Sequence, residues 1–325
     1  MSRKADPVEI AFHRAVRGLV PDGAPLVVAV SGGGDSVALL HLVGPYAARH
    51  GIAVTVAHLD HGLRRGSAAD RRFVEALAAT LRLPVVAERC LVKGERRRDE
   101  SLEEAARRVR RAFLMRAAER SGASLVATGH TQDDQAETIL MRFARGAGPA
   151  ALAAMAPSGP GPFVRPLLGL ERAELRAWLR RRRHAYRDDP TNDDLAFDRN
   201  RVRRLVVPAL MKAVNPQAAR HLVEAAARLR SDAAFLDALA LERFDAIATR
   251  RGGRVGIDAA GLASLPGPLA SRVARLALVA AGCDPRHVSA RHVGAVVGLA
   301  ALAEGASIDL PGKRRAEKRR GRIVL

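Results

Sequence analysis

One stretch decides the fold of this chain: Leu26-Val27-Val28-Ala29-Val30-Ser31-Gly32-Gly33-Gly34-Asp35-Ser36-Val37-Ala38-Leu39-Leu40. Its first five residues are apolar and mostly β-branched, which predicts a buried strand. From Val37 onward the apolar residues have helical spacing, and the residues between are small, polar or acidic. Three consecutive glycines allow the backbone to adopt positive φ and to approach a ligand closely. The stretch therefore predicts a strand–loop–helix unit.

The loop from Ser31 to Ser36 is suited to binding phosphate. The N–H groups of a first helical turn have no intrahelical partners, and the helix dipole attracts anions there. Asp35 is a poor phosphate ligand by itself, so we interpret it as a ligand of the Mg²⁺ that accompanies polyphosphate. A tight glycine turn without a ligand is the alternative. The loop is not a Walker A or dinucleotide-binding loop, because it lacks the lysine of the first and the third glycine of the second.

The net charge is the strongest signal in the composition. The 325 residues allow two domains, and they carry a formal charge of +20 with 54 basic residues. Such a field favours a polyanionic partner, most plausibly a nucleic acid. Because aromatic residues make up only 3% of the chain, a binding face built on base stacking is disfavoured.

Cysteine usage and apolar runs exclude several classes of protein. The two cysteines, Cys90 and Cys283, are far apart in the sequence, which argues against a disulfide framework, a structural zinc site and an iron–sulfur cluster. The N-terminus has no apolar core segment, and no run approaches 18 apolar residues. We therefore expect a cytoplasmic protein without a signal peptide or a membrane span. The oligomeric state is left open, with a homodimer as one option.

Strand and helix patterns alternate through the first two thirds of the chain. This alternation predicts the α/β class, with a doubly wound parallel sheet similar to the Rossmann fold. A long helical pattern from Gln217 to about Thr249 then leads into a smaller, mostly helical C-terminal region whose tail resembles two short strands. We predict one domain over 1–215, and a connector helix with a smaller, mostly helical C-terminal domain over 216–325.

Polar clusters follow three of the predicted strands, at 31–36, 58–64 and 129–138. The carboxyl ends of parallel strands meet at one edge of a sheet, so a single pocket could hold all three clusters. The second cluster offers His58, Asp60 and His61 for ribose, base or metal contacts. The third offers the carboxylates of Asp134 and Glu137, which are spaced to hold an ammonium group.

Each of these residues also has a purely structural interpretation. A histidine at a strand end is often only a hydrogen-bonded core residue, and acidic residues at a helix start suit the helix dipole without any ligand. Arg110 could neutralise charge on a phosphorus undergoing transfer. Alternatively, Arg107 and Arg110 could only pair with the glutamates Glu103 and Glu104 on the same helix.

Seven motifs occur in an order that points to one family. They are Ser31-Gly32-Gly33-Gly34-Asp35-Ser36, His58-Leu59-Asp60-His61-Gly62-Leu63-Arg64, Leu102-Glu103-x-x-Ala106-Arg107-x-x-Arg110, Gly129-His130-Thr131-Gln132-Asp133-Asp134-Gln135-Ala136-Glu137-Thr138, Arg165-Pro166-Leu167-Leu168, Asp189-Pro190-Thr191-Asn192 and Arg199-Asn200-Arg201-Val202-Arg203. Together they resemble the tRNA(Ile)-lysidine synthases, a family of N-type ATP pyrophosphatases with a PP-loop. The resemblance is strong over about 24–210. Arg111 and Ser101 depart from the family's usual Tyr and Asn.

The resemblance implies a reaction and a set of roles, with a PP-loop adenylation domain over 1–215 and a tRNA-binding C-terminal domain over 216–325. ATP with Mg²⁺ adenylates the wobble cytidine of a CAU-anticodon tRNA(Ile), and free L-lysine then displaces AMP to give lysidine. The assigned ATP-binding residues are Ser31, Gly32, Gly33, Gly34, Asp35, Ser36, His58, Asp60 and His61, with Asp35 as the metal ligand. The lysine-binding residues are Asp134 and Glu137, the catalytic residues are Asp35, Arg110 and Asp134, and the tRNA-binding residues are Arg107, Arg199 and Arg203.

Three other functions compete with this one. A tRNA thiolation enzyme of the PP-loop type shares the ATP chemistry, but such enzymes commonly use paired cysteines. A small-molecule amidotransferase or synthetase of this type does not need so positive a chain. A non-catalytic RNA-binding protein that keeps a nucleotide loop is disfavoured by the acidic pair and by Asp35.

Overall fold

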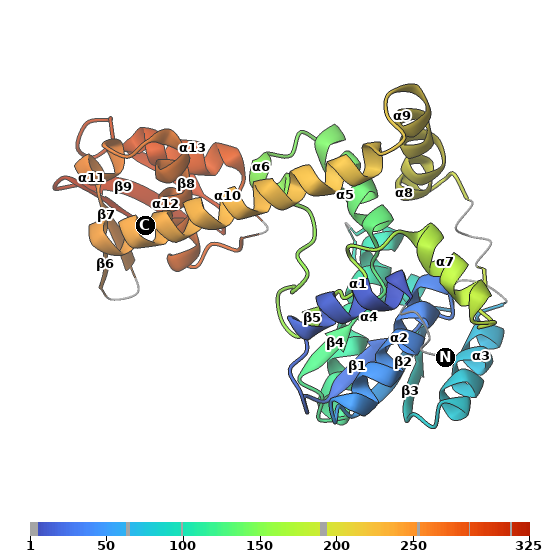
Figure 1. The fold of residues 1–325 in the computed structure, drawn as a ribbon. Coiled ribbons are helices and arrows are strands. Elements are labelled where there is room, and N and C mark those ends of the chain that lie inside the picture. Colours follow the sequence, from blue (N-terminus) through green and yellow to red (C-terminus); the bar gives the residue numbers. More distant parts are fainter. Residues whose placement is uncertain are drawn as a thin grey trace. The chain divides into compact units, whose positions relative to one another are not determined.

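The computed structural model describes residues 6–62, 66–98, 100–188, 194–251, 254–285, 287–312 and 314–325. Leu63 and Arg64, and the motif from Asp189 to Asn192, lie outside these ranges. The chain forms two compact units, Met1–Ala227 and Arg228–Leu325, which divide within helix α10 (Ala218–Ile247) (Figure 1). The functional division at 215/216 stays a prediction.

The first unit is built on a five-stranded parallel sheet with the strand order β3-β2-β1-β4-β5. Its strands are β1 (Leu26–Ala29), β2 (Val54–Asp60), β3 (Val85–Arg89), β4 (Leu125–Ala127) and β5 (Phe163–Val164). The predicted parallel α/β sheet is therefore confirmed. β1 is central and apolar on both faces, as strands buried between two layers of helices are.

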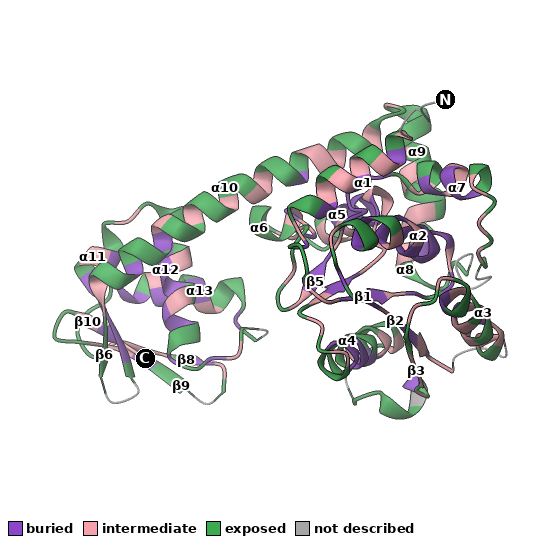
Figure 2. Cartoon of the chain, turned by 60° about the horizontal axis from the view of Figure 1, so that its bottom comes forward, coloured by how far each residue is buried: buried purple, intermediate pink, exposed green. Residues whose placement is uncertain are grey.

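Helices cover both faces of this sheet. The helices of the first unit are α1 (Pro7–Arg17), α2 (Gly34–Arg49), α3 (Ser67–Thr80), α4 (Leu102–Arg120), α5 (Gln132–Ala144), α6 (Pro149–Leu152), α7 (Arg172–Arg181), α8 (Asp198–Arg201) and α9 (Val207–Ala213), with a 3₁₀ turn η1 (Val92–Glu95) and a π-helical turn η3 (Val202–Val206). Leu26 and Val28 of β1 face a core shared with α1, α2 and α7, whereas Val27 packs against α4. Figure 2 shows α1 and α2 on one side of the sheet and α4 on the other.

The strand order places the site. The chain passes from β1 to β2 and β3 on one side, and then returns to β4 on the other side of β1. Ligands of open α/β sheets bind at this switch point, beyond the carboxyl ends of the strands. Here the switch lies between β1 and β4, so it brings the Ser31–Ser36 loop beside the segment that begins at Gly129.

The second unit combines helices with an antiparallel sheet. It contains the end of α10, β6 (Ala248–Arg251), β7 (Arg254–Asp258), α11 (Ala259–Ala263), α12 (Gly267–Ala280), α13 (Ala290–Leu299), β8 (Ser307–Leu310), β9 (Arg314–Arg319) and β10 (Arg322–Val324), with the strand order β6-β7-β10-β9-β8. Its core includes Ile257, Val273 and Ile323. The long helix and the two tail strands were predicted, but the other three strands were not. None of the described helices has the length and apolar character needed to cross a bilayer.

Candidate active site

The loop after β1 leads directly into the N-terminus of helix α2. α2 begins at Gly34 with Gly33 as its N-cap, and no side chain of the described residues caps it. The Ser36 hydroxyl donates to the Gly33 carbonyl (2.9 Å) and accepts from the Ser31 N–H (3.1 Å). Gly32 has a φ of +94°, which side chains resist. The first-turn N–H groups are therefore available to an anion.

A segment far along the sequence lies against this loop. The Arg187 N–H donates to the Gly32 carbonyl (3.0 Å), and the Arg187 guanidinium pairs with Asp70 of α3 (2.6 Å). The ring of Tyr186 is so close to Gly34 that an added Cβ would lie 3.4 Å from it. Tyr186 and Arg187 therefore contact the phosphate loop directly. The sequence did not predict this contact.

Gly129, at the end of β4, touches the loop from the other side. A Cβ at this position would lie 3.1 Å from the Ser36 nitrogen and 3.2 Å from the Asp35 carbonyl oxygen. Both neighbours are backbone atoms at the start of α2, so they cannot yield by a side-chain rotation. A glycine at position 129 therefore lets the β4–α5 connection meet the phosphate loop.

Gly129→Ala is expected to slow ATP cleavage to AMP about tenfold, because the methyl group pushes the loop from its place at a cost of about 1–3 kcal/mol. Gly169→Ala is the matched control, since nothing lies within 4 Å of a Cβ added there. AMP release measured with ATP and tRNA tests this. An unchanged rate in Gly129→Ala would show that the contact does not position the loop.

His58 and His61 each have a ring nitrogen that lacks a hydrogen-bond partner among the described residues. His58 is 3% exposed, and its Nδ1 donates to the Val30 carbonyl (2.8 Å), which makes Nε2 an acceptor. That Nε2 and the Nδ1 of His61 are buried without a partner among the described residues. Burial, with Arg110 and His58, lowers the pKa of His61 to about 4, so the ring is neutral near pH 7. Unpaired buried polar atoms of this kind favour a ligand contact.

Asp60 stabilises the backbone turn that follows β2. Its side chain is buried, and one carboxylate oxygen accepts from the Gly62 N–H (2.8 Å), where the backbone turns with a φ of +60°. Arg89 lies 3.6 Å from the other oxygen. Asp60 therefore shapes the turn that carries His61, and its assignment to ATP binding stays a prediction.

Asp134 and Glu137 lie one turn apart on α5, and both are buried. Arg199 pairs with Asp134 (2.9 Å) and with Glu137 (2.6 Å), while Arg203 pairs with Glu137 (2.7 Å). Arg172, the first residue of α7, pairs with Asp134 as well (2.9 Å). The predicted acidic pair is therefore brought together, but three arginines surround it.

Helix capping fixes the orientation of Asp134. One of its oxygens accepts from the N–H (2.8 Å) and hydroxyl (3.1 Å) of Thr131, which forms the capping box of α5. The other oxygen faces Arg172 and Arg199. Burial raises the pKa of this carboxyl, but Arg199, Arg172 and His130 outweigh it, so the net shift is downward and Asp134 stays ionised at neutral pH.

Asp35 joins the acidic pair to the phosphate loop. Its Oδ2 accepts from Arg172 Nε (3.0 Å), while its Oδ1 is buried without a partner among the described residues. Burial outweighs the effect of Arg172 and raises the pKa of Asp35. An unpaired buried carboxylate oxygen beside a phosphate loop fits a divalent cation. The described residues contain no cluster of three or more metal-ligating side chains, so such a cation would also rely on phosphate oxygens.

Arg107 and Arg110 on α4 have no hydrogen-bond or ion-pair partner among the described residues. Glu104 instead completes the predicted capping box with Ser101, so the pairing alternative for these arginines is not seen. Burial lowers the pKa of nearby Arg165, and the positive charges of Arg107 and Arg111 lower it further. Such a surface suits a polyanion.

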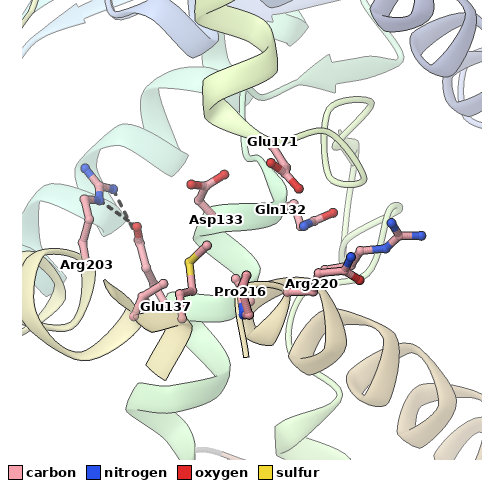
Figure 3. A pocket seen from close by; sticks show the side chains of 11 residues that line it. Gln132, Asp133, Glu137, Glu171, Arg203, Pro216 and Arg220 are labelled. Atoms are coloured by element: carbon pink, nitrogen blue, oxygen red, sulfur yellow. Dashed lines mark hydrogen bonds and ion pairs between the residues drawn. The ribbon is translucent and has the colours of Figure 1, made fainter. Parts of the chain in front are cut away.

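A pocket of about 230 Å³ opens beside the acidic pair (Figure 3). It is lined by Gln132, Asp133, Glu137, Glu171, Arg203, Val207, Met211, Pro216, Gln217, Ala219 and Arg220. Figure 3 shows the carboxylates of Asp133, Glu137 and Glu171 around it, with Arg203 bonded to Glu137. This mixture of carboxylates with apolar side chains suits a ligand that has a methylene chain and a cationic end.

Comparison with known proteins places this arrangement in a class. Residues 8–210 match the PP-loop domain family. Among solved structures, the U34-tRNA thiolase NcsA from Methanococcus maripaludis, which carries a [4Fe-4S] cluster, has a TM-score of 0.59. The match covers 69% of this chain and 78% of the thiolase chain, at 16% sequence identity, so the likeness concerns the fold alone.

Similar sequences narrow the class. The tRNA(Ile)-lysidine synthase of Thermobifida fusca is 38% identical over 98% of this chain and 96% of its own length. The tRNA(Ile)-lysidine synthase of Geobacter sulfurreducens is 43% identical over 89% of this chain and 62% of its own. The chain belongs to the PP-loop family and, within it, to the tRNA(Ile)-lysidine synthases.

Proposed function

We propose that this ATP-using ligase joins free L-lysine to C2 of the wobble cytidine, C34, of a CAU-anticodon tRNA(Ile). The products are lysidine, AMP and diphosphate. The observation that carries the proposal is the buried pair Asp134 and Glu137: Glu137 lines a pocket of about 230 Å³, and Asp134 shares its partner Arg172 with Asp35 of the phosphate loop. An amine-accepting site next to an ATP site is what a ligation of lysine requires.

In the first step the C2 carbonyl oxygen of the cytidine attacks the α-phosphorus of ATP. The bond from this phosphorus to the bridging oxygen breaks, and diphosphate leaves. The first-turn N–H groups of α2 are available to hold the phosphates, and Arg110 on α4 supplies positive charge without an acidic partner among the described residues. Asp35 would hold Mg²⁺, which neutralises phosphate charge when bound.

In the second step an amine of lysine attacks C2 of the adenylated base. The amine first gives up one proton to water, because an ammonium group has no free electron pair. The new bond then joins nitrogen to C2, the bond from C2 to the AMP oxygen breaks, and a second proton passes from nitrogen to water. Asp134 and Glu137 bind the cation before it reacts, and Val207, Met211 and Pro216 offer apolar contacts to its methylene chain. Positioning of the two reactants supplies most of the rate enhancement.

The tRNA requires the positive surface of the chain. Arg107 is free to meet phosphates, whereas Arg199 and Arg203 already pair with Glu137. Of these three arginines, Arg107 is therefore the one that can bind a tRNA phosphate without first leaving an acidic partner. A tRNA substrate and ATP together also support a cytoplasmic location.

The thiolation alternative has less support. Cys90 belongs to the first compact unit and Cys283, which is buried, belongs to the second. The acidic pair has no task in sulfur transfer, whereas a lysine substrate requires it.

Labelled L-lysine, Mg²⁺-ATP and a CAU-anticodon tRNA(Ile) transcript test the proposal. Lysine should become covalently attached to C34, with one AMP released for each lysine. A transcript with a different anticodon is the control and should accept no lysine. AMP release without lysine attachment would contradict the proposed function.

A further inference from the structure

Arg172 occupies the centre of the acidic site. Its guanidinium contacts four carboxylates: Asp35 (3.0 Å), Asp134 (2.9 Å), Glu137 (3.5 Å) and Asp133 (3.8 Å). The side chain is only 15% exposed. These carboxylates outweigh burial, which acts in the opposite direction, and they raise the pKa of Arg172. A permanent cation therefore stands where a lysine ammonium group would find its partners.

The backbone holds Arg172 at this place. Its N–H donates to a carboxylate oxygen of Asp133 (2.8 Å), which ties the start of α7 to the first turn of α5. α7 also begins with a capping box between Glu171 and Glu174, so the first residue of the helix has a defined position. The side chain is thus directed by two helices at once.

The contacts of Arg172 are weakest on the side of the pocket. Glu137 holds Arg199 and Arg203 at 2.6 and 2.7 Å, but it lies 3.5 Å from Arg172. Asp133 is 3.8 Å away. Both Glu137 and Asp133 line the pocket, whereas Arg172 does not. A cation that enters the pocket would meet Glu137 and Asp133, whose contacts with the Arg172 guanidinium are the longest of the four.

We infer that Arg172 is a resident cation that fills the amine subsite in the free protein and gives up Asp134 and Glu137 when lysine binds. This inference rests on the proposed function. Displacement leaves no buried charge unpaired, because the Arg172 Nε can keep its partner Asp35 while the lysine ammonium takes the other carboxylates. Lysine must compete with Arg172, so the affinity for lysine is lower than the carboxylates alone would provide.

Lysine affinity of substituted proteins tests the inference. Titration calorimetry with L-lysine should give a Kd about fivefold lower for Arg172→Gln than for the wild type, since the competing cation is gone. Arg172→Lys, which restores a cation, should bind lysine more weakly than Arg172→Gln does. Arg181→Gln is the matched control, because Arg181 lies on the same helix but pairs with Asp6 (2.9 Å). This substitution should not change the Kd for lysine.

Thermal unfolding gives a second readout. Arg172→Gln leaves four carboxylates with two arginines, so its Tm without lysine should be below that of the wild type. Added lysine should then raise the Tm more in this variant than in the wild type. If Arg172→Gln does not fold, Arg172→Lys carries the test, and its Kd for lysine should still be lower than the wild-type value because an ammonium group makes fewer contacts than a guanidinium.

The possible results distinguish an error in this inference from an error in the proposed function. Equal or weaker lysine binding by both Arg172 variants, with lysine binding intact in the wild type, would overturn the inference alone and would make Arg172 a structural clamp or a substrate contact. Wild-type protein that binds no lysine would contradict the proposed function as well.

Discussion

Asp35→Asn is expected to reduce AMP formation from ATP by at least about a hundredfold, with tRNA affinity nearly unchanged. The carboxylate has one oxygen on Arg172 and one buried oxygen without a partner among the described residues. An amide keeps the shape of the side chain, but it loses the charge that a divalent cation requires. AMP release over a Mg²⁺ titration measures the effect, and filter binding of tRNA measures affinity.

Two controls make the Asp35 result interpretable. Asp22→Asn removes a carboxylate that is 77% exposed and pairs with His50, so it should leave AMP formation unchanged. A melting temperature close to that of the wild type would show that Asp35→Asn folds. A loss of tRNA affinity as large as the loss of AMP formation would mean that Asp35 serves tRNA binding rather than ATP activation.

The architecture around the phosphate loop could be predicted from the sequence because its signals are local. The apolar, mostly β-branched run ending at Val30 favours a buried strand, and the glycines that follow mark the loop that it enters. The second unit was harder to predict. β6, Ala248–Arg251, is half arginine and none of its residues is buried, so it lacks the alternation of apolar residues that identifies a strand.

The carboxylates of the site were also predictable, but their partners were not. Asp134 and Glu137 stand out because two acidic residues follow a strand end at helical spacing. Arg172 is 35 residues from Glu137 in the sequence, and Arg199 is 62 residues from it. In a chain with 54 basic residues, no pattern separates an arginine that pairs with a buried acid from one that faces solvent. Only the folded structure, in which α7 and α8 meet α5, shows which arginines pair with these acids.

Gly129 and the Tyr186 segment were missed for a related reason. The predicted sheet brings the 129–138 cluster to the same edge as the loop, but the direct contacts that Gly129 and Tyr186 make with the loop depend on distances that no sequence pattern shows. A glycine directly after a strand was the one available signal, since such a residue often marks close approach of two backbones.

Glu137→Gln is expected to separate the two halves of the reaction. Glu137 has a side chain only 2% exposed, and it is the carboxylate that contacts Arg172, Arg199 and Arg203 and also lines the pocket. Neutralising it leaves three guanidinium groups with one fewer acidic partner, so an incoming ammonium group meets a more positive site. Lysidine formation should fall at least about a hundredfold, as for loss of a buried ion-pair partner.

Adenylation should survive the same change, because Glu137 does not contact the phosphate loop through any described interaction, whereas Asp35 belongs to it. Exchange of labelled diphosphate into ATP in the presence of tRNA should therefore remain within about tenfold of the wild type. Glu103→Gln, at an exposed position of α4, is the matched control for the substitution. Loss of exchange and of lysidine formation in parallel, with an unchanged melting temperature, would place Glu137 in ATP activation instead of lysine binding.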